Sequence, residues 1–133
     1  MDPGEGLVAS LKELADAARL DAAAIVSGVG MLSSVELGFF DTGRDDYQAT
    51  SFDGIYDLNS VLGNIVRRDG APVPHVHVIF NDTGHATYGG HLLEATCHIT
   101  MEIFLSASPL ALSRVKHPGK PATQIVCRPE RDD

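Results

Sequence analysis

The stretch from Ala95 to Leu105 constrains the fold most, because apolar and polar side chains alternate along it. The two alternating sets are Ala95, Cys97, Ile99, Met101, Ile103 and Leu105 on one side, and Thr96, His98, Thr100 and Glu102 on the other. Successive side chains of a strand point to opposite faces, so the pattern predicts a strand with one buried face and one face that is wet or lines a site. Half-buried strands of this kind are typical of antiparallel sheets.

The rest of the chain predicts one helix followed by many short strands. Residues 4–19 suit an amphipathic helix, because Leu7, Leu11 and Leu14 recur at helical spacing and Ala18 continues the stripe. Turn sequences such as Asp53-Gly54 separate the β-rich runs that follow. The predicted strands are residues 22–29, 33–40, 47–52, 58–67, 73–81, 85–88 and 123–127, and a short helical turn is expected to start at residues 108–109.

This order of elements predicts an α+β fold with a mostly antiparallel multi-stranded sheet and an N-terminal amphipathic helix. The 133 residues match the size of a single domain, so we expect one domain over residues 1–133. Such a sheet has edges and a broad face to cover. One helix is too little to cover them, so we also expect self-association.

The charge of the chain argues against direct binding to nucleic acid. The formal net charge is −8, which repels polyanions. Half of the basic residues nevertheless lie near the C-terminus, at Arg114, Lys116, Lys120, Arg128 and Arg131. Such a cluster is more typical of a solvated chain end, and the sequence contains no Arg-Gly-Arg-Pro-type arm that could enter a minor groove.

The sequence predicts neither a secretory signal peptide nor a membrane-spanning segment. The first residues carry an acid and no apolar stretch, and no apolar run approaches the ~18 residues that span a bilayer. We therefore expect a cytoplasmic protein without a membrane partner.

Motifs for nucleotide binding and nucleophilic catalysis are absent from the sequence. Gly28 and Gly30 begin a glycine-rich pattern, but Ser33 stands where the dinucleotide fingerprint needs its third glycine. The sequence also lacks Gly-x-Ser-x-Gly, Cys-x-x-Cys, His-Glu-x-x-His and Gly-x-x-x-x-Gly-Lys.

Three histidines carry the clearest chemical signal. His75 and His77 are two residues apart in a β-like run, so both imidazoles point to the same face. His91 follows Gly89-Gly90, a pair that lets a backbone or a ligand come close. Three imidazoles are the ligand set of an open zinc-type site with a fourth position for water or substrate. Histidines bonded within a core are the alternative reading of the spacing.

Other polar residues give weaker signals. His85 is expected to be exposed in a turn, His117 to lie in a loop, and His98 to share a strand face with Glu102. Glu102 is the candidate carboxylate of the site, either as a partner that orients a ligand imidazole or as a general base for water. A plain surface glutamate is the alternative. Asn64, which follows Gly63, is either a polar group of the site or a bulge residue.

Several short segments occur in an order that is typical of one known family. They include Gly4-Glu5-Gly6-Leu7, Val26-Ser27-Gly28-Val29-Gly30, Leu37-Gly38-Phe39-Phe40-Asp41, Leu62-Gly63-Asn64-Ile65, His75-Val76-His77-Val78, Tyr88-Gly89-Gly90-His91-Leu92 and Met101-Glu102-Ile103. With these segments the chain resembles the PPC domain (plant and prokaryote conserved), also called DUF296, in its stand-alone prokaryotic type. The resemblance runs from about residue 4 to residue 127.

The resemblance implies a compact α+β domain that usually assembles as a homotrimer. In prokaryotic members the His-x-His and Gly-Gly-His segments resemble a metal site, most often for zinc, and the matching residues here are His75, His77 and His91. Plant relatives join the domain to AT-hook arms that bind A·T-rich DNA and use it for protein contacts. This chain has no such arm, so a DNA-binding role inherited from those relatives is doubtful.

Three functions remain open from the sequence. The first is a homotrimer that binds zinc, or another divalent transition metal, through the three histidines, with the metal either structural or catalytic. The second is a DNA-associated or protein-interaction module in which the histidines are structural. The third is a zinc-dependent enzyme that acts on a small polar molecule near Glu102.

Overall fold

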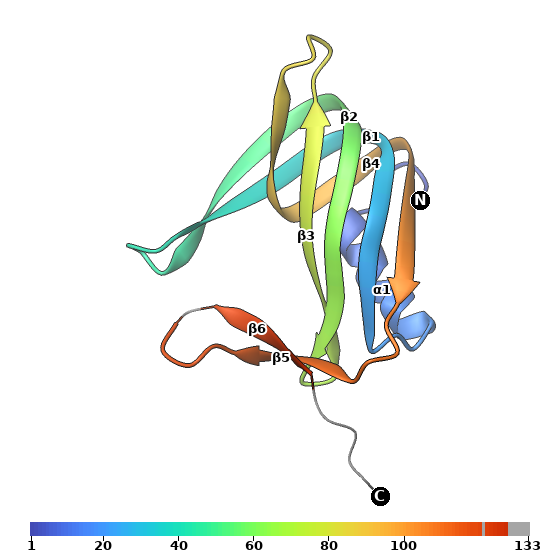
Figure 1. Ribbon diagram of the computed structural model, residues 1–133. Helices are drawn as coiled ribbons and strands as arrows, with labels where there is room; N and C mark the ends of the chain where they lie inside the picture. The colour runs from blue at the N-terminus through green and yellow to red at the C-terminus, as the bar shows by residue number, and fades with distance from the viewer. Residues whose placement is uncertain (121, 128–133) are drawn as a thin grey trace, which may run out of the picture.

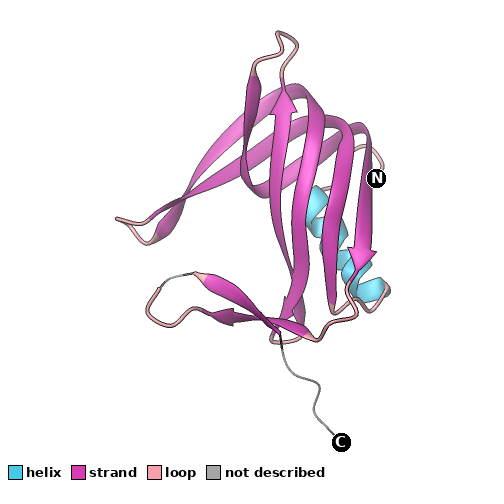
Figure 2. Cartoon of the chain, in the orientation of Figure 1, coloured by secondary structure: helices cyan, strands magenta, loops and turns pink. Residues whose placement is uncertain are grey.

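The computed structural model describes residues 1–120 and 122–127 of the chain. Its elements are α1 (Leu7–Ala17), β1 (Ala22–Asp41), β2 (Asp46–Arg68), β3 (Ala71–Asn81), β4 (Thr87–Ala107), β5 (Leu112–Lys116) and β6 (Thr123–Cys127). All pairings between these strands are antiparallel. The predicted α+β fold, a mostly antiparallel sheet with one N-terminal helix in a single domain, is therefore confirmed (Figure 2).

Strands β1 to β4 form one closed sheet. β1 pairs with β2 and β4, and β3 also pairs with both, so the sheet closes on itself. In Figure 1 the four long strands run side by side at the front, and α1 lies behind them. The far ends of β1 and β2 extend into a two-stranded arm, here defined as residues 37–50, whose base still pairs with β4 through Leu37 and Gly38.

Several strands that the sequence predicts as separate are parts of longer ones. Residues 22–29 and 33–40 both belong to β1, and residues 47–52 and 58–67 both belong to β2. Glycines inside these strands allow close contact with neighbouring strands instead of ending them. Gly63, with φ of 153°, is an example, because a Cβ at this position would collide with the backbone carbonyl of His75 on β3. Only glycine lets β2 and β3 approach this closely.

The alternation predicted for β4 is confirmed at most positions and fails at Ile99. Ala95, Cys97 and Met101 are buried as expected, whereas Ile99 is exposed. Between the pairs Leu32–Cys97 and Gly30–Met101, β4 contains more residues than β1 does. This bulge leaves Ile99 without a register partner on β1 and exposed, while Met101 beyond the bulge is buried again.

The core fills the closed sheet and extends to α1. Phe80, Leu32 and Val61 of the strands are fully buried together with Leu7 of the helix. The helix is shorter than the predicted residues 4–19, and its buried stripe differs. Leu7, Leu11 and Ala15 are the buried residues of α1. The predicted stripe residue Leu14 is 48% exposed because it points away from the sheet.

Side chains from distant strands bind both ends of α1. At the N-terminus the Glu94 carboxylate accepts hydrogen bonds from the backbone N–H groups of Val8 (2.8 Å) and Ala9 (3.2 Å). At the C-terminus the Arg67 guanidinium donates to the carbonyl oxygen of Ala15 (3.1 Å). Both contacts satisfy helix groups that have no partner within the helix. The described residues contain no helix that is long and apolar enough to cross a membrane.

The C-terminal part of the described chain is a separate hairpin of β5 and β6. The prediction of a helical turn that starts at residues 108–109 is wrong, since this segment is irregular and leads into β5. The hairpin packs against β2. In Figure 1 it projects to the same side of the closed sheet as the arm. Of the predicted basic cluster, Arg128 and Arg131 lie outside the described residues.

Candidate metal centre

Strand β3 presents His75 and His77 on the outer face of the closed sheet. Val76 and Val78, which alternate with them, are buried in the core. The two imidazoles therefore point outward together, as the spacing predicts. Their ring centroids are 5.4 Å apart.

Strand β4 brings the third histidine to the same place. In the β3–β4 register His91 lies directly opposite His77, and paired residues of neighbouring strands share a face. The His91 ring centroid is 5.1 Å from that of His75 and 5.4 Å from that of His77. One candidate ligand atom from each of the three residues lies within 4.8 Å of the others. The histidines that the sequence selects therefore form one cluster.

The geometry and the donor set of this cluster fit a divalent transition metal. Nitrogen ligands of a tetrahedral zinc ion, each about 2.0–2.1 Å from the metal, are roughly 3.3 Å from one another. Metal binding therefore requires the rings to turn toward one another, and none of the three is fully buried, since two are partly buried and His77 is exposed. Three imidazoles also leave a coordination position free on the open side.

The surroundings keep two of these imidazoles, those of His75 and His91, in the form that binds metal. Burial lowers the pKa of His75, and the nearby Arg114 and His77 lower it further. Burial likewise lowers the pKa of His91, with added repulsion from His75 and His77. A lowered pKa favours the neutral imidazole near pH 7, and the neutral ring is the metal ligand.

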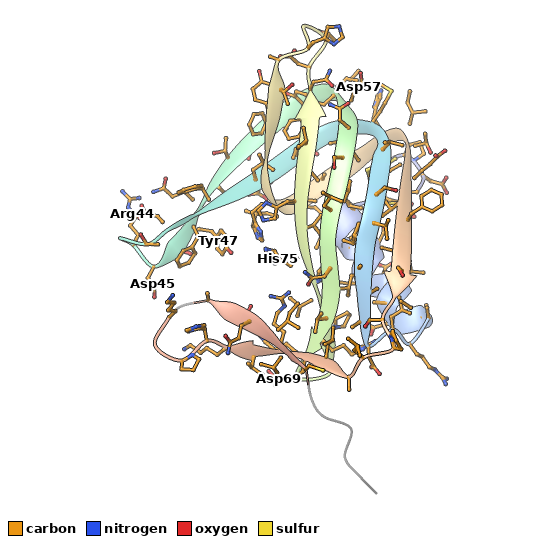
Figure 3. The ribbon with its side chains drawn as sticks, viewed as in Figure 1. Arg44, Asp45, Tyr47, Asp57, Asp69 and His75 are labelled. Atoms are coloured by element: carbon orange, nitrogen blue, oxygen red, sulfur yellow. The ribbon has the colours of Figure 1, made fainter. Side chains whose placement is uncertain are left out.

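The histidines form part of the wall of a cavity of about 650 Å³. The other walls come mainly from the arm, and the lining includes Leu37, Phe39, Phe40, Tyr47, Thr50 and Phe52. The Tyr47 ring stacks on His91, with centroids 5.0 Å apart and an interplanar angle of 22°. In Figure 3, Tyr47 projects from the arm on the side of the sheet that carries His75. The site thus combines a polar floor with an apolar wall, as ligand pockets commonly do.

A second cavity of about 450 Å³ adjoins the first and contains a residue that the sequence analysis did not assign to the site. His75, His91 and Tyr47 line this cavity together with Arg114 of β5 and Thr123 of β6. In the sequence Arg114 is only one member of a basic cluster. Its position beside the histidines depends on the hairpin folding back over β2, for which the local sequence gives no signal.

The two other candidate site residues, Asn64 and Glu102, differ in whether they lie near the histidine cluster. Asn64 lies opposite His75 in the β2–β3 register and contacts Arg114, so it belongs to the surroundings of the site. Glu102 is exposed and lies opposite Val29, far along β1 from the Gly38 that lies opposite His91. Within one chain the structure does not bring Glu102 to the histidines.

The other three histidines also lie outside the cluster. His85 is in the turn between β3 and β4 and has a positive φ of 63°. His98 is on β4 beside the bulge, and His117 follows β5 and contacts the carbonyl oxygen of Pro118. Among the described residues, His75, His77 and His91 form the group able to hold a metal ion.

Comparison with known proteins supports the fold. The model of the Plants and Prokaryotes Conserved (PCC) domain matches residues 1–109 of the chain. A search of curated proteins found no match.

Solved structures with the same fold come from bacteria and archaea. A protein from Ralstonia eutropha JMP134 named "putative DNA-binding protein" is 26% identical, with a TM-score of 0.89 over 95% of this chain and 87% of that one. A plant- and prokaryote-conserved (PPC) protein from Pyrococcus horikoshii is 28% identical, with a TM-score of 0.82 over 89% and 82% of the two chains. A structure named as a metal-containing protein, from Archaeoglobus fulgidus, is 26% identical, with a TM-score of 0.84 over 95% and 89%.

Proposed function

This chain belongs to the Plants and Prokaryotes Conserved (PCC) domain family, and from this membership we propose that it binds one divalent transition metal ion, with zinc the first candidate, through His75, His77 and His91. The observation that carries the proposal is the convergence of three imidazoles from two strands, with ligand atoms within 4.8 Å of one another. The similarity to an archaeal protein named as metal-containing supports it.

The residues around the histidines suit the binding of a small molecule. His75, His77 and His91 would hold the ion at the wall of the cavity, and the apolar side chains of the arm would cover the rest of a ligand. A zinc ion in such a site supplies a Lewis acid for a polar group of that ligand. The proposed activity is therefore the binding, or the metal-assisted conversion, of a small polar molecule. A role for Glu102 stays a prediction for the assembled protein.

The first experiment measures the metal content of tag-free protein purified without added metal. Elemental analysis is expected to find about one zinc per chain in the wild type and almost none in a His75→Ala/His77→Ala double variant. The matched control is a His85→Ala/His98→Ala double variant, which removes two histidines outside the cluster and should keep the metal. Circular dichroism checks that both variants fold.

Two results would contradict the metal proposal. One is a wild-type protein that holds no divalent metal after reconstitution at neutral pH. The other is equal metal content in the wild type and in the His75→Ala/His77→Ala variant. Either result would shift the interpretation to an interaction module.

We also propose that the protein is a homotrimer in the cytoplasm, as the family resemblance implies. Exposed apolar side chains on the outer face of the sheet support the oligomer, because monomeric proteins rarely expose such a surface. The histidine site lies on this same outer face, so a neighbouring subunit could complete its wall.

A DNA-associated or protein-interaction module is the second candidate function. The relatives named "putative DNA-binding protein" favour it. The net charge of −8 opposes its DNA version. A mobility-shift assay with duplex DNA at low salt separates the candidates, since a salt-dependent shift supports DNA binding and no shift excludes it.

A further inference from the structure

Arg114 is a buried cation, and among the described residues its charge has no partner of opposite sign. The residue is only 7% exposed, although it is on a hairpin at the edge of the molecule. It donates hydrogen bonds from Nη2 to Asn64 Oδ1 (2.8 Å) and from Nη1 to Thr123 Oγ1 (3.2 Å). Both acceptors are neutral, and the ion pairs found among the described residues do not include Arg114.

The guanidinium of Arg114 also has unused donors. It carries five N–H groups, and the two hydrogen bonds use only part of them. Nε is buried and has no hydrogen-bond partner among the described residues. A buried charge without a counter-ion is costly, and a protein normally retains one where something compensates it. An anion at Arg114 would supply this compensation.

The position of Arg114 connects this unpaired charge to the histidines. Asn64, which accepts a hydrogen bond from Nη2, lies opposite His75 in the β2–β3 register. Arg114, His75 and His91 line the same cavity of about 450 Å³. A molecule in this cavity can therefore contact the guanidinium and the open side of the histidine cluster together.

The second cavity contains the cation Arg114, and neither of the two cavities contains an acid. Among the described residues that line them, none is Asp or Glu, although the whole chain has 18 acidic residues. Arg68 and Lys116 line a neighbouring cavity that also contains Arg114 and one acid, Asp69. A divalent ion on three neutral imidazoles would add to this positive field. The local electrostatics thus select anions in a protein that is acidic overall.

We propose that Arg114 forms an anion subsite, and that the ligand of the metal centre is a small organic oxyanion, a carboxylate or a phosphate-type monoester, whose acidic group is bound by this guanidinium. The proposal rests on the proposed function, because it names the class of molecule that the metal site receives. Arginine suits the role, since its planar fork binds carboxylate or phosphate oxygens through two parallel hydrogen bonds. The aromatic side chains Tyr47 and Phe40, which line both cavities, would contact the apolar body of the ligand.

A purely structural role for Arg114 makes a different prediction. Its bonds to Asn64 and Thr123 also hold the hairpin to β2, so its loss could lower stability without any ligand. If Arg114 is only structural, its replacement should change the affinity for a charged ligand and for a neutral ligand of the same shape equally. Binding measurements with matched ligands therefore separate the two roles.

The test uses benzoate and phenylphosphonate as probes and calorimetry as the measurement. Zinc-loaded and zinc-free wild-type protein is titrated with each probe, and with benzamide as the neutral analogue of benzoate. The variants are Arg114→Gln, Arg114→Lys and the control Arg44→Gln, which removes an exposed arginine at the tip of the arm. Zinc content and melting temperature are measured for every sample.

We expect at least one of the two anions to bind the zinc-loaded wild type about tenfold or more tightly than benzamide. Arg114→Gln should weaken that binding by about tenfold or more at unchanged zinc content, because it removes a charge-assisted hydrogen bond. Arg114→Lys keeps the charge but not the planar guanidinium, so its anion affinity should lie between those of the wild type and Arg114→Gln. The anion affinity of Arg44→Gln should equal that of the wild type. The anion that binds more tightly shows whether the site prefers a carboxylate or a phosphate-type group.

Three results would overturn the proposal. They are a wild type that binds neither anion, a wild type that binds neither anion more tightly than benzamide, and a folded Arg114→Gln variant with unchanged anion affinity. If Arg114→Gln does not fold, Arg114→Lys and the wild-type comparison with benzamide still decide. Failure of the metal proposal is seen separately, as absence of zinc, and the zinc-free titration then tests Arg114 alone.

Discussion

At the scale of single residues, His75 and His91 are kept neutral by their surroundings. Burial is the main cause of their lowered pKa values, followed by repulsion from Arg114 and His77 for His75, and from the two other histidines for His91. The same residues that prepare the site for a metal therefore make the metal-free protein sensitive to acid.

The sign of this sensitivity follows from proton linkage. In the unfolded chain both histidines titrate near pH 6.5, whereas in the folded chain their pKa values are lower. Below pH 6.5 the unfolded state then binds more protons, so the melting temperature of metal-free protein should fall as pH decreases from 6.5 toward the lowered values. Above pH 6.5 this contribution should be constant.

Thermal unfolding of metal-free protein between pH 8 and pH 5 checks this prediction. A His75→Asn/His91→Asn variant should show a flatter dependence on pH in the acidic half of that range. His85→Asn is the control, because His85 lies outside the cluster and asparagine tolerates its positive φ. Equal acid sensitivity of the wild type and the His75→Asn/His91→Asn variant would contradict the prediction.

At the scale of elements, helix α1 depends on a carboxylate from β4. Gly6 precedes the helix and offers no capping side chain, so the N–H groups of Val8 and Ala9 bind Glu94 instead. The negative charge also interacts favourably with the N-terminal end of the helix dipole. Glu94 thus couples the helix to the strand that carries His91.

Glu94→Ala should lower the free energy of unfolding by about 1–2 kcal/mol, which is the usual cost of losing a helix cap. Urea denaturation monitored by circular dichroism measures the change. Glu102→Ala is the matched control, because it removes an exposed glutamate from the same strand and should change stability by less than about 0.5 kcal/mol. Equal stability of Glu94→Ala and the wild type would show that another group caps α1.

At the scale of the whole molecule, the outer face of the sheet carries apolar side chains that are exposed to solvent. The pairing of β1 to β4 places four exposed apolar side chains across neighbouring strands, here named the outer band. Its members and their exposed fractions are Ile79 (49%), Leu62 (53%), Val26 (56%) and Phe104 (67%). α1 lies behind the sheet in Figure 1 and leaves this face uncovered, so the outer band is the natural contact surface for another copy of the chain.

Light scattering during size-exclusion chromatography tests the proposed trimer. The wild type should have about three times the chain mass of 14.2 kDa. Phe104→Glu should shift the protein toward the monomer, because it places a charge in the outer band. Ile55→Glu changes an exposed isoleucine outside the band and should leave the mass unchanged. A monomeric wild type, or a trimer unaffected by Phe104→Glu, would exclude this interface.

The sequence determined the class of the fold and the identity of the histidine cluster. Alternation in residues 95–105 and the turn signals indicated antiparallel strands, and these patterns are local because side chains in a strand repeat every two residues. The His75–His77 spacing fixed their common face for the same reason. The convergence with His91 could be stated only as an expectation, since it depends on the register between β3 and β4.

Only the tertiary structure decided the rest. The bulge at Ile99, the Glu94 cap and the position of Arg114 beside His75 all depend on contacts between segments far apart in the chain. Gly30 lies between two strands that the sequence predicts as separate, yet in the folded chain it lets β1 and β4 approach closely within one continuous sheet. Local patterns specify which face a residue takes, whereas strand register and hairpin packing specify which faces meet, and here these contacts place Arg114 in one cavity with His75 and His91.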